Sequence, residues 1–477
     1  MKMFINGQRR DASDGRTIDV LNSATLEFID TIPFATKADI EEAIAAAKEG
    51  AKIWGSMACH ERSAILFKAA DMIDARREEL ARSLSTEMGK IISEARPEIR
   101  VAAQIIRGYA EKANHLYGET LTDYQVGTEK DIVFTRHEPL GVVACITPFN
   151  YPVELCSQKY AAALAAGNAV IIKPATDNPL TIMKVIEILW QAGVPGNVLQ
   201  LITGSGSEIG DILTASPDIN AIALTGSTEV GLHVAEVGAR TLKKVFLELG
   251  GNDPYIVFDD ADFELAVTGA VRGRCQNAGQ TCCSPKRFLV QNSIKDAFIK
   301  RAIEQIEALV HGSPLDDATE FGSLISEKAC KKVDEQVKLT IAQGGRLICG
   351  GKPISATYYE PTIIDTPADA DISKDMECFG PVLPIIGFDT EEEAIAISNQ
   401  TMYGLQAGVI TKDMNKALRV ASKLECGGVV INQSGNYRHL DQAFGGWKMS
   451  GVGREGVSIT LEEMTQVKSY VLRNILQ

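Results

Sequence analysis

One cysteine of the sequence stands in a loop of small and amide-bearing residues. Cys282 follows residues 276–281, which read QNAGQT, so the backbone could turn closely around its thiol. The thiolate is the reactive form of cysteine, and a free thiol has a pKa of about 8.5. A nucleophilic site must therefore supply amides, a helix dipole or a nearby base. The residues alone leave two interpretations open, a reactive cysteine or a structural one.

Two further polar residues come directly after apolar runs. Glu248 stands in LELGG at residues 247–251, and a glutamate in apolar surroundings has a raised pKa that suits a general base. Asn150 lies at the bend of PFNYP at residues 148–152, where its amide could donate to a developing oxyanion. The alternative interpretations are a salt-bridged or helix-capping glutamate and an asparagine that only forms a turn.

Two glycine-containing segments could hold a phosphate. Residues 204–210 read GSGSEIG, which misses the dinucleotide-binding fingerprint by one residue and is weak evidence alone. Residues 224–228 read LTGST and link a predicted buried strand to a helix, whose first amides could bind a pyrophosphate. Lys173 ends another apolar strand, where its ammonium could reach ribose hydroxyls or phosphate.

Composition narrows the classes of function. The chain has 477 residues, 45% of them hydrophobic and 23% charged, which is typical of globular proteins with two or three domains. A formal net charge of −14 argues against binding to nucleic acid or an anionic membrane. The sequence begins without an apolar leader, and no apolar run reaches roughly 18 residues, so we expect a cytoplasmic protein. The expected partners are small molecules and further copies of the chain.

The ten cysteines show neither C-x-x-C nor Cys/His spacing. We therefore expect no metal site and mostly reduced, buried thiols.

The pattern of apolar residues predicts an α/β architecture. Residues 36–115 are expected to form a helical layer that Thr36 caps. From residue 141, short β-rich runs alternate with helices, which predicts a doubly wound parallel sheet, and a second α/β series begins after residue 253. Residues 118–138 and 465–477 alternate like exposed strands, and unpaired strand edges favour a homo-oligomer.

These segments, in this order, resemble the aldehyde dehydrogenase superfamily from about residue 3 to the C-terminus. The motif Asn-x-Gly-Gln-x-Cys matches residues 277–282 and makes Cys282, rather than Cys283, the implied nucleophile. The motif Glu-Leu-Gly-Gly implies a base at Glu248, and Pro-Phe-Asn-x-Pro implies an oxyanion donor at Asn150. Residues 444–456, FGGWKMSGVGREG, match another signature of the family.

The resemblance also implies a nicotinamide cofactor, NAD or NADP. The motif Glu-x-Phe-Gly-Pro at residues 377–381 suggests that Glu377 holds the nicotinamide ribose while Phe379 packs near the ring. Members that prefer NAD commonly have a glutamate where this chain has Thr176, so the cofactor preference stays open, and Asn252 replaces a common lysine. The expected cofactor contacts are Thr147, Pro148, Lys173, Thr176, Gly206, Gly210, Thr225, Gly226, Ser227, Leu249, Gly250, Glu377 and Phe379.

The implied fold is that of an aldehyde dehydrogenase. We expect an NAD(P)-binding domain at residues 1–117 and 139–247, and an α/β catalytic domain at residues 248–445. Residues 118–138 and 446–477 are expected to form a β oligomerisation flap. A homodimer or homotetramer would follow.

The implied reaction oxidises an aldehyde to its carboxylic acid. Cys282 adds to the aldehyde, Asn150 holds the oxyanion, hydride passes to the nicotinamide, and Glu248 activates water to cleave the thioester. A CoA-acylating aldehyde dehydrogenase, an esterase and a non-catalytic NAD(P)-binding relative are the alternatives.

The substrate is expected to be a small hydroxylated or anionic aldehyde. The chain looks closest to the branch with lactaldehyde, semialdehyde and phosphonoacetaldehyde dehydrogenases, and sulfoaldehydes fit the same expectation. Arg438 could pair with an anionic group, or could instead be bonded to Asp441 or to an oligomer interface. Arg107 and Tyr151 are the other expected substrate contacts.

Overall fold

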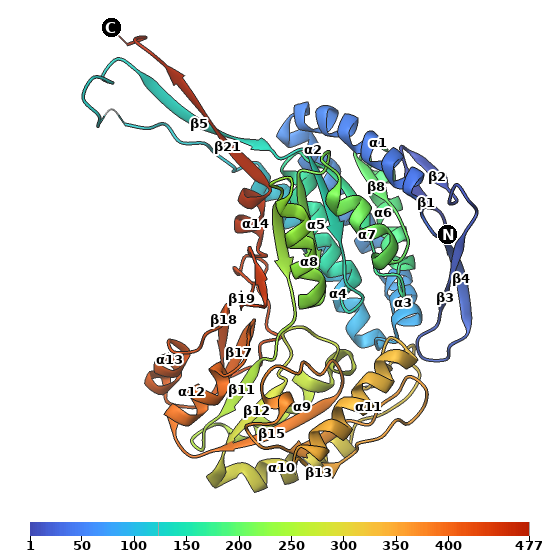
Figure 1. Ribbon diagram of the computed structural model, residues 1–477, viewed down its shortest axis with the longest axis vertical. Coiled ribbons are helices and arrows are strands. Elements are labelled where there is room, and N and C mark those ends of the chain that lie inside the picture. The colour runs from blue at the N-terminus through green and yellow to red at the C-terminus, as the bar shows by residue number, and fades with distance from the viewer. Residues whose placement is uncertain (123, 477) are drawn as a thin grey trace.

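Two sheets stacked along the long axis of the molecule form the body of the protein, and a thin arm extends from the end of the first (Figure 1). This computed structural model describes residues 1–122 and 124–476. Helices pack on both sheets, and the chain passes from the first sheet to the second after Glu248. The predicted α/β architecture is confirmed.

The first sheet has the strand order β2-β1-β8-β7-β6-β9-β10-β20. Strands β8, β7, β6, β9 and β10 are parallel, and every residue of β7 and β9 is buried, because helices cover both faces of the sheet. The strands are β1 (Met3–Ile5), β2 (Gln8–Arg10), β6 (Val142–Ile146), β7 (Ala169–Lys173), β8 (Leu199–Leu201), β9 (Ala221–Thr225), β10 (Lys244–Glu248) and β20 (Gly451–Val452).

The predicted helical layer at residues 36–115 consists of α1–α4. Thr36 caps α1 as predicted, since its hydroxyl accepts from the Asp39 backbone amide. Gly89, with φ of 80°, ends α3 in the left-handed conformation that glycine adopts without strain. The helices of this part are α1 (Lys37–Ser56), α2 (Cys59–Ala75), α3 (Arg77–Met88), α4 (Ile92–Ala113), α5 (Pro152–Ala165), α6 (Leu180–Ala192), α7 (Gly206–Ala215), α8 (Thr228–Ala239) and α14 (Val457–Glu463).

The second sheet has the order β13-β14-β15-β12-β11-β17-β18 and is parallel except for the β13–β14 pair. Its strands are β11 (Pro254–Val257), β12 (Arg287–Gln291), β13 (Arg346–Cys349), β14 (Thr362–Asp365), β15 (Val382–Phe388), β17 (Gln406–Ile410) and β18 (Gly428–Ile431). Its helices are α9 (Phe263–Cys275), η1 (Gln276–Gly279), α10 (Asn292–Glu307), α11 (Glu327–Ala342), η2 (Asp371–Ser373), α12 (Glu391–Asn399) and α13 (Met414–Ala421).

The strand order of the first sheet reverses at β6. Strands β7 and β8 follow it on one side, and β9 and β10 lie on the other. In open sheets of this kind, ligands bind at the carboxyl ends of the strands beside such a reversal. Thr147, Lys173, Thr225 and Glu248 stand at the ends of β6, β7, β9 and β10. The fold therefore brings four of the predicted site residues to one edge.

The arm is built from two segments that are far apart in the sequence. Strand β5 (Ile132–Pro139) pairs antiparallel with β21 (Thr465–Leu472), with Ile132 opposite Leu472. The predicted strand at residues 118–138 is only partly formed, because the described residues before β5 contribute no strand and pair with β5 through the isolated bridge Thr120–Phe134.

Residues 446–464 lie on the body rather than on the arm. Strand β19 (Trp447–Lys448) pairs with β16 (Tyr403–Gly404), β20 extends the first sheet, and α14 packs against α4. Near the N-terminus, β3 (Thr17–Leu21) pairs with β4 (Phe28–Pro33). Within the described ranges, none of the helices combines the length and the apolar composition that a membrane crossing requires.

Candidate active site

The loop before Cys282 is held in an unusual backbone conformation. Asn277, Ala278 and Gly279 all have positive φ, at 51°, 53° and 80°. The left-handed conformation costs a non-glycine residue roughly 1–2 kcal/mol, so the surroundings must enforce it. Gly279 has no substitute, because a Cβ there would lie 2.2 Å from the carbonyl oxygen of Gly380. This close approach sets the path of the chain into Cys282.

The Asn277 side chain joins this loop to the first sheet. Its Nδ2 donates to the Asn150 carbonyl oxygen at 2.9 Å and to the Gln280 carbonyl oxygen at 3.0 Å. Gln280 in turn accepts a hydrogen bond from the Ile325 amide at 2.9 Å. The two predicted segments around Asn150 and Cys282 are therefore fixed against each other.

A buried arginine joins the same loop to the segment around Glu377. Arg274 is 0% exposed and donates to the carbonyl oxygens of Val382 at 2.7 Å and Cys378 at 2.5 Å. It also donates to the Ser284 hydroxyl at 2.7 Å, just after the cysteine pair. Sequence reasoning did not assign Arg274, since its partners come from distant segments.

Cys282 opens into a cavity of about 480 Å³ between α4, α5 and the loop at residues 436–440. Tyr151 and Arg438 line it, as predicted, and the Tyr151 hydroxyl lies 3.4 Å from the Thr281 hydroxyl. Arg107 does not line this cavity, and its guanidinium instead binds Asp71 and Asp74 of α2.

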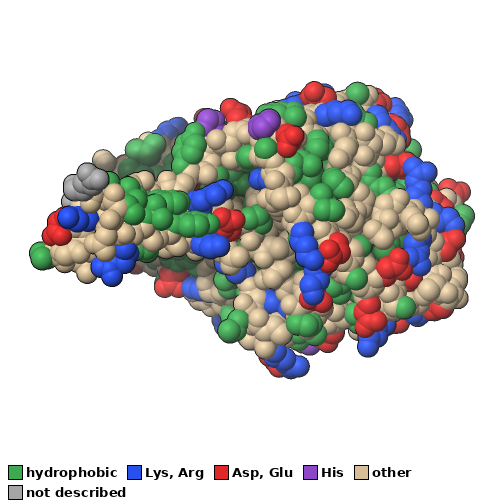
Figure 2. Space-filling view, turned by 90° about the horizontal axis from the view of Figure 1, so that it is seen from above, with side chains coloured by type: hydrophobic (Ala, Val, Ile, Leu, Met, Phe, Trp, Pro, Cys, Tyr) green, Lys and Arg blue, Asp and Glu red, His purple; other side chains and the backbone are tan. Residues whose placement is uncertain are grey.

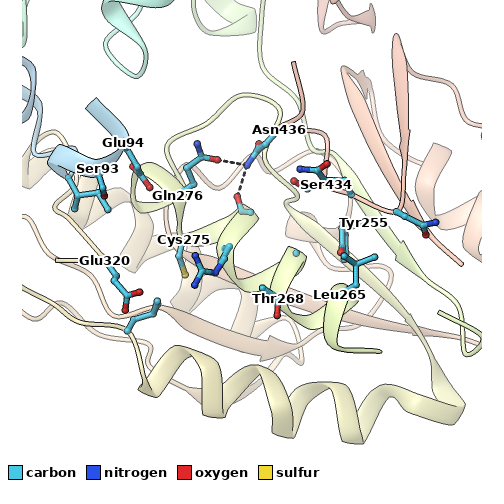
Figure 3. Close-up of a pocket in the computed structure, with 17 residues that line it drawn as sticks. Ser93, Glu94, Tyr255, Leu265, Thr268, Cys275, Gln276, Glu320, Ser434 and Asn436 are labelled. Atoms are coloured by element: carbon cyan, nitrogen blue, oxygen red, sulfur yellow. Dashed lines mark hydrogen bonds between the residues drawn. The ribbon is translucent and has the colours of Figure 1, made fainter. Parts of the chain in front are cut away.

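A wider cavity of about 780 Å³ adjoins the first one (Figure 3). Ser93, Glu94, Gln276 and Asn436 line both. Asn436 holds this shared wall, since its Nδ2 donates to the Gly273 carbonyl oxygen at 2.9 Å and to the Gln276 side chain at 3.0 Å. The two cavities therefore share one wall beside the thiol.

The cavity at Cys282 is lined by side chains of both charge signs. Burial raises the pKa values of Glu94 and Glu154 to about 7. Arg438 packs its guanidinium 3.7 Å from the Phe444 ring centroid and donates to Glu455 at 3.3 Å. Arg438 is therefore bonded neither to Asp441, which binds Ser458, nor to a carboxylate of the cavity.

Glu248 is a buried carboxylate without a hydrogen-bond partner among the described residues. Burial raises its pKa well above the ordinary value, and the neighbouring Glu455 raises it further. Lys159 and Arg438 act in the opposite direction. Glu248, Lys159 and Glu455 line a small cavity of about 20 Å³, roughly the room for one water molecule.

Lys159 and Glu455 form a buried ion pair behind Glu248. The Lys159 ammonium donates to Glu455 at 2.8 Å, and both side chains are less than a tenth exposed. Glu455 lies in the family signature at residues 444–456, but the sequence predicted no role for Glu455 or Lys159. One feature of the sequence could have indicated this ion pair. Lys159 is the one charged residue between positions 155 and 166, and a lysine in such an apolar helix needs a partner.

The surroundings of Cys282 raise the pKa of its thiol. A hydrogen bond with the neighbouring Cys283 raises its pKa, burial adds to the effect, and the nearby charges of Lys286 and Arg438 oppose it. Cys283 is buried and its thiol lies 3.9 Å from the Asn436 side-chain oxygen. These surroundings therefore favour the neutral thiol over the thiolate.

The carboxyl edge of the first sheet fits a dinucleotide. The hydroxyls of Thr147 and Thr225 are buried without partners among the described residues. Burial lowers the pKa of Lys173 to about 8, and among the described residues its ammonium donates a hydrogen bond only to the Pro174 carbonyl oxygen. Ser227 caps α8, whose first amides can face a phosphate. These unpaired donors suit ribose and pyrophosphate oxygens.

Other predicted cofactor residues are placed as follows. Gly226 donates its amide to the Glu248 carbonyl oxygen at 3.1 Å, and the Thr176 hydroxyl donates to the Gly204 carbonyl oxygen at 3.1 Å. Gly206 and Gly210 lie at the start of α7 and face open space, so the protein's own packing does not require glycine there. Pro148 follows Thr147 after β6.

The segments after β10 and around Glu377 meet at this edge. Glu377 accepts a hydrogen bond from the Gly251 amide at 3.1 Å, and a Cβ on Gly250 would lie 2.6 Å from the Glu377 carboxylate. The Phe379 ring stands edge-on to Phe149, with the ring centroids 5.9 Å apart. Leu249, beside Gly250, is buried. The residues present therefore fit a nicotinamide ribose at Glu377.

Asn252 has a structural role in this arrangement. Its Nδ2 donates to the carbonyl oxygens of Ile372 at 3.0 Å and Lys374 at 2.8 Å. The Asn252 amide thus fixes the η2 segment. It does not supply the positive charge that the common lysine would bring to this position.

Comparison with known proteins agrees with this geometry. The model of the aldehyde dehydrogenase family matches residues 10–470. The chain belongs to the aldehyde dehydrogenase family. Aldehyde dehydrogenases oxidise aldehydes to acids with NAD or NADP through a cysteine thioester, and this chain is such an enzyme.

This aldehyde dehydrogenase is 40% identical over 466 residues to a glutarate-semialdehyde dehydrogenase of Pseudomonas putida, with 98% of the chain and 96% of the relative covered. It is 38% identical over 477 residues to a lactaldehyde dehydrogenase of Methanococcus maripaludis, covering 99% and 100%. A crystal structure of an E. coli NADP-dependent enzyme matches it with a TM-score of 0.96 and 37% identity, covering 99% and 98%. The similarity extends over the whole enzyme.

We predict that Arg438→Ala in this aldehyde dehydrogenase raises the KM for succinate semialdehyde by about tenfold, because a guanidinium in the cavity can pair with a carboxylate. The KM for lactaldehyde should change much less. Steady-state kinetics with both aldehydes gives the ratio, and Arg100→Ala, on the exposed side of α4, is the matched control. An equal rise for both aldehydes would exclude Arg438 from anion recognition.

Proposed function

We propose that the enzyme oxidises a short polar aldehyde, hydroxylated or anionic, with Cys282 as nucleophile and Glu248 as base. The observation that carries this proposal is the cavity at Cys282, where a half-buried thiol meets polar and charged side chains. The names of the similar enzymes, which act on glutarate semialdehyde and lactaldehyde, support the same substrate class.

In the first step, the Cys282 sulfur bonds to the aldehyde carbon while the thiol proton leaves to solvent water. The hydrogen bond with Cys283 and burial raise the pKa of the thiol, so the proton leaves as the sulfur–carbon bond forms. The side-chain amide of Asn150 donates to the oxyanion that forms. Asn277 fixes the backbone of Asn150 through its hydrogen bond to the Asn150 carbonyl oxygen. When bound, the nicotinamide supplies the acceptor for the hydride that leaves the same carbon.

In the second step, Glu248 takes a proton from water, whose oxygen attacks the thioester carbon. The acid leaves, and Glu248 passes the proton it took from water to the Cys282 sulfur. Lys159 and Arg438 keep the carboxylate form of Glu248 accessible, because their positive charges counter the burial of the carboxyl group. One aldehyde, one water and one oxidised cofactor therefore give one acid, one reduced cofactor and one proton.

Cofactor binding follows from the same edge of the sheet. We propose that Glu377 accepts hydrogen bonds from the nicotinamide ribose, while Lys173 and the α8 N-terminus bind the adenosine ribose and pyrophosphate. The residue at position 176 is a threonine, whose neutral hydroxyl donates to the Gly204 carbonyl oxygen. A carboxylate at this position would repel the 2′-phosphate of NADP, and the hydroxyl does not. NADP is therefore expected to be accepted beside NAD.

The experiment that tests the proposed reaction follows the absorbance of the reduced nicotinamide. The panel contains lactaldehyde, glycolaldehyde, succinate semialdehyde, glutarate semialdehyde, phosphonoacetaldehyde, sulfoacetaldehyde and propanal, each with NAD and with NADP. We expect reduction with polar aldehydes in the absence of CoA, and its loss in Cys282→Ala with cofactor binding retained. Cys283→Ala, beside it in the chain, is the matched control and should keep activity.

Each contrary outcome of this panel has a definite meaning. Activity only after addition of CoA would identify an acylating enzyme. Normal turnover by Cys282→Ala would move the nucleophile to another residue. Faster oxidation of propanal than of every polar aldehyde would overturn the proposed substrate class.

We predict that Glu248→Gln keeps a first burst of reduced cofactor but slows steady turnover by about 100-fold, because only the second step then lacks its base. In the unmodified enzyme, kcat should rise with pH as Glu248 loses its proton, and this rise should lie at a higher pH than for an ordinary glutamate because the pKa of Glu248 is raised. Stopped-flow absorbance across pH measures both, with the exposed Glu335→Gln on α11 as the control. An unaffected steady rate would remove Glu248 from this role.

We also propose that the enzyme is a homo-oligomer that pairs through its arm. Apolar side chains gather along the arm (Figure 2), and Val467 and Val471 of β21 are 62% and 57% exposed. A two-stranded ribbon is marginally stable alone, and exposed strand edges pair readily. Light scattering should give a multiple of the 51.5 kDa chain mass, which Val467→Lys combined with Val471→Lys lowers. A single-chain mass for the unmodified enzyme would contradict this.

A further inference from the structure

Lys286 is a buried lysine that no sequence motif assigned. It stands between the cysteine pair and β12, and its side chain is 0% exposed. Its backbone amide donates to the Asp253 carbonyl oxygen at 2.9 Å, which fixes the segment at the start of the second sheet. A buried ammonium is costly unless anionic or carbonyl oxygens surround it, so its partners indicate what it does.

The ammonium of Lys286 binds two parts of the candidate site at once. Its Nζ donates to the carbonyl oxygen of Cys282 and lies 3.3 Å from Oε1 of Glu377. The ring of Phe379 is 5.7 Å from the same nitrogen. One cation therefore joins the backbone of the proposed nucleophile to the carboxylate of the proposed ribose contact.

Glu377 depends on this cation for its orientation. Its Oε1 also accepts the Gly251 amide, and its other oxygen approaches Gly250, so the carboxylate stands between the segment after Glu248 and Lys286. The carboxylate has two fixed donors and is still about a fifth exposed, so part of it remains free for a ligand. Loss of the ammonium would leave a single backbone amide to hold it.

We propose that Lys286 is a positioning residue that couples the cofactor site to the nucleophile, by orienting the Glu377 carboxylate toward the ribose and fixing the Cys282 carbonyl. This inference rests on the proposed roles of Cys282 and Glu377. It predicts two separate consequences of removing the charge, weaker cofactor binding through Glu377 and a less acidic thiol at Cys282. The second follows because the positive charge of Lys286 lowers the pKa of the Cys282 thiol.

The test compares Lys286→Met, which removes the charge, with Lys286→Arg, which keeps it. Fluorescence titration with NADH and NADPH gives the dissociation constants, and the rate of iodoacetamide alkylation of the Cys282 peptide, by mass spectrometry, gives the pH midpoint of the thiol. In Lys286→Met, we expect about tenfold weaker cofactor binding and a midpoint about one pH unit higher. Lys286→Arg should keep most of the cofactor affinity and most of the normal thiol midpoint, because it retains the positive charge. Lys295→Met, which removes a lysine paired with Asp365 on the second sheet, is the control.

A double-mutant cycle identifies the route of the effect. Glu377→Gln should weaken cofactor binding, and adding Lys286→Met to it should weaken binding little more, because the lysine acts through that carboxylate. The alkylation midpoint should still move when Lys286 is replaced in the Glu377→Gln background. Additive losses of cofactor affinity would overturn the proposed route.

Two further outcomes would contradict the inference. If Lys286→Met left both the cofactor affinity and the thiol midpoint unchanged, Lys286 would have no coupling role. If Lys286→Arg lost as much as Lys286→Met at an unchanged melting temperature, packing rather than charge would explain the lysine. Should Lys286→Met fail to fold, Lys286→Gln, which still donates to one oxygen, replaces it. These readouts need no aldehyde, so their failure is distinguishable from silence in the substrate panel.

Discussion

The site depends on one side-chain amide that joins the two sheets. Asn277 donates to the Asn150 carbonyl oxygen on the first sheet's loop and to the Gln280 carbonyl oxygen within its own loop. It does so beside Ala278, whose left-handed conformation a free loop would not keep. The proposed oxyanion donor and the proposed nucleophile therefore hold a fixed relation, although they belong to different sheets. The remaining contacts of the site extend from this connection.

Burial then sets the chemistry of the ionisable groups. Glu248 and Cys282 both have raised pKa values, so the surroundings favour the neutral form of each group. Behind Glu248, the pair of Lys159 and Glu455 brings compensating charge close to the carboxylate. A carboxyl group in water would be ionised throughout the neutral range and would be a weak base. Exclusion of water is thus what gives a common side chain its proposed role.

The cofactor edge and the substrate cavity are built on different principles. The edge follows from the parallel strands, whose ends carry Thr147, Lys173 and Thr225 in a row because the strand order reverses at β6. The cavity is formed by helices and loops from separate parts of the chain, and it mixes Arg438 with Glu94 and Glu154. Such a mixture suits polar aldehydes of more than one kind, which agrees with the range of substrates among the similar enzymes.

The sequence by itself determined the alternation of strands and helices, the family, and the segments around Cys282, Glu248 and Asn150. These features show in local sequence patterns: a glycine such as Gly279 marks a turn in its own segment, and the apolar run before Glu248 marks a buried strand. The cap at Thr36 is predictable for the same reason.

Only the tertiary structure decided which charges meet. Arg107 was expected near the substrate, yet Asp71 and Asp74 on a neighbouring helix bind it, while Lys286 carried no signal and lies at the centre of the site. Residues 118–138 alternate like a strand, but only their last part finds a partner, in β21. Pairing, burial and the pKa values that burial sets arise between segments distant in sequence, and no local pattern contains them.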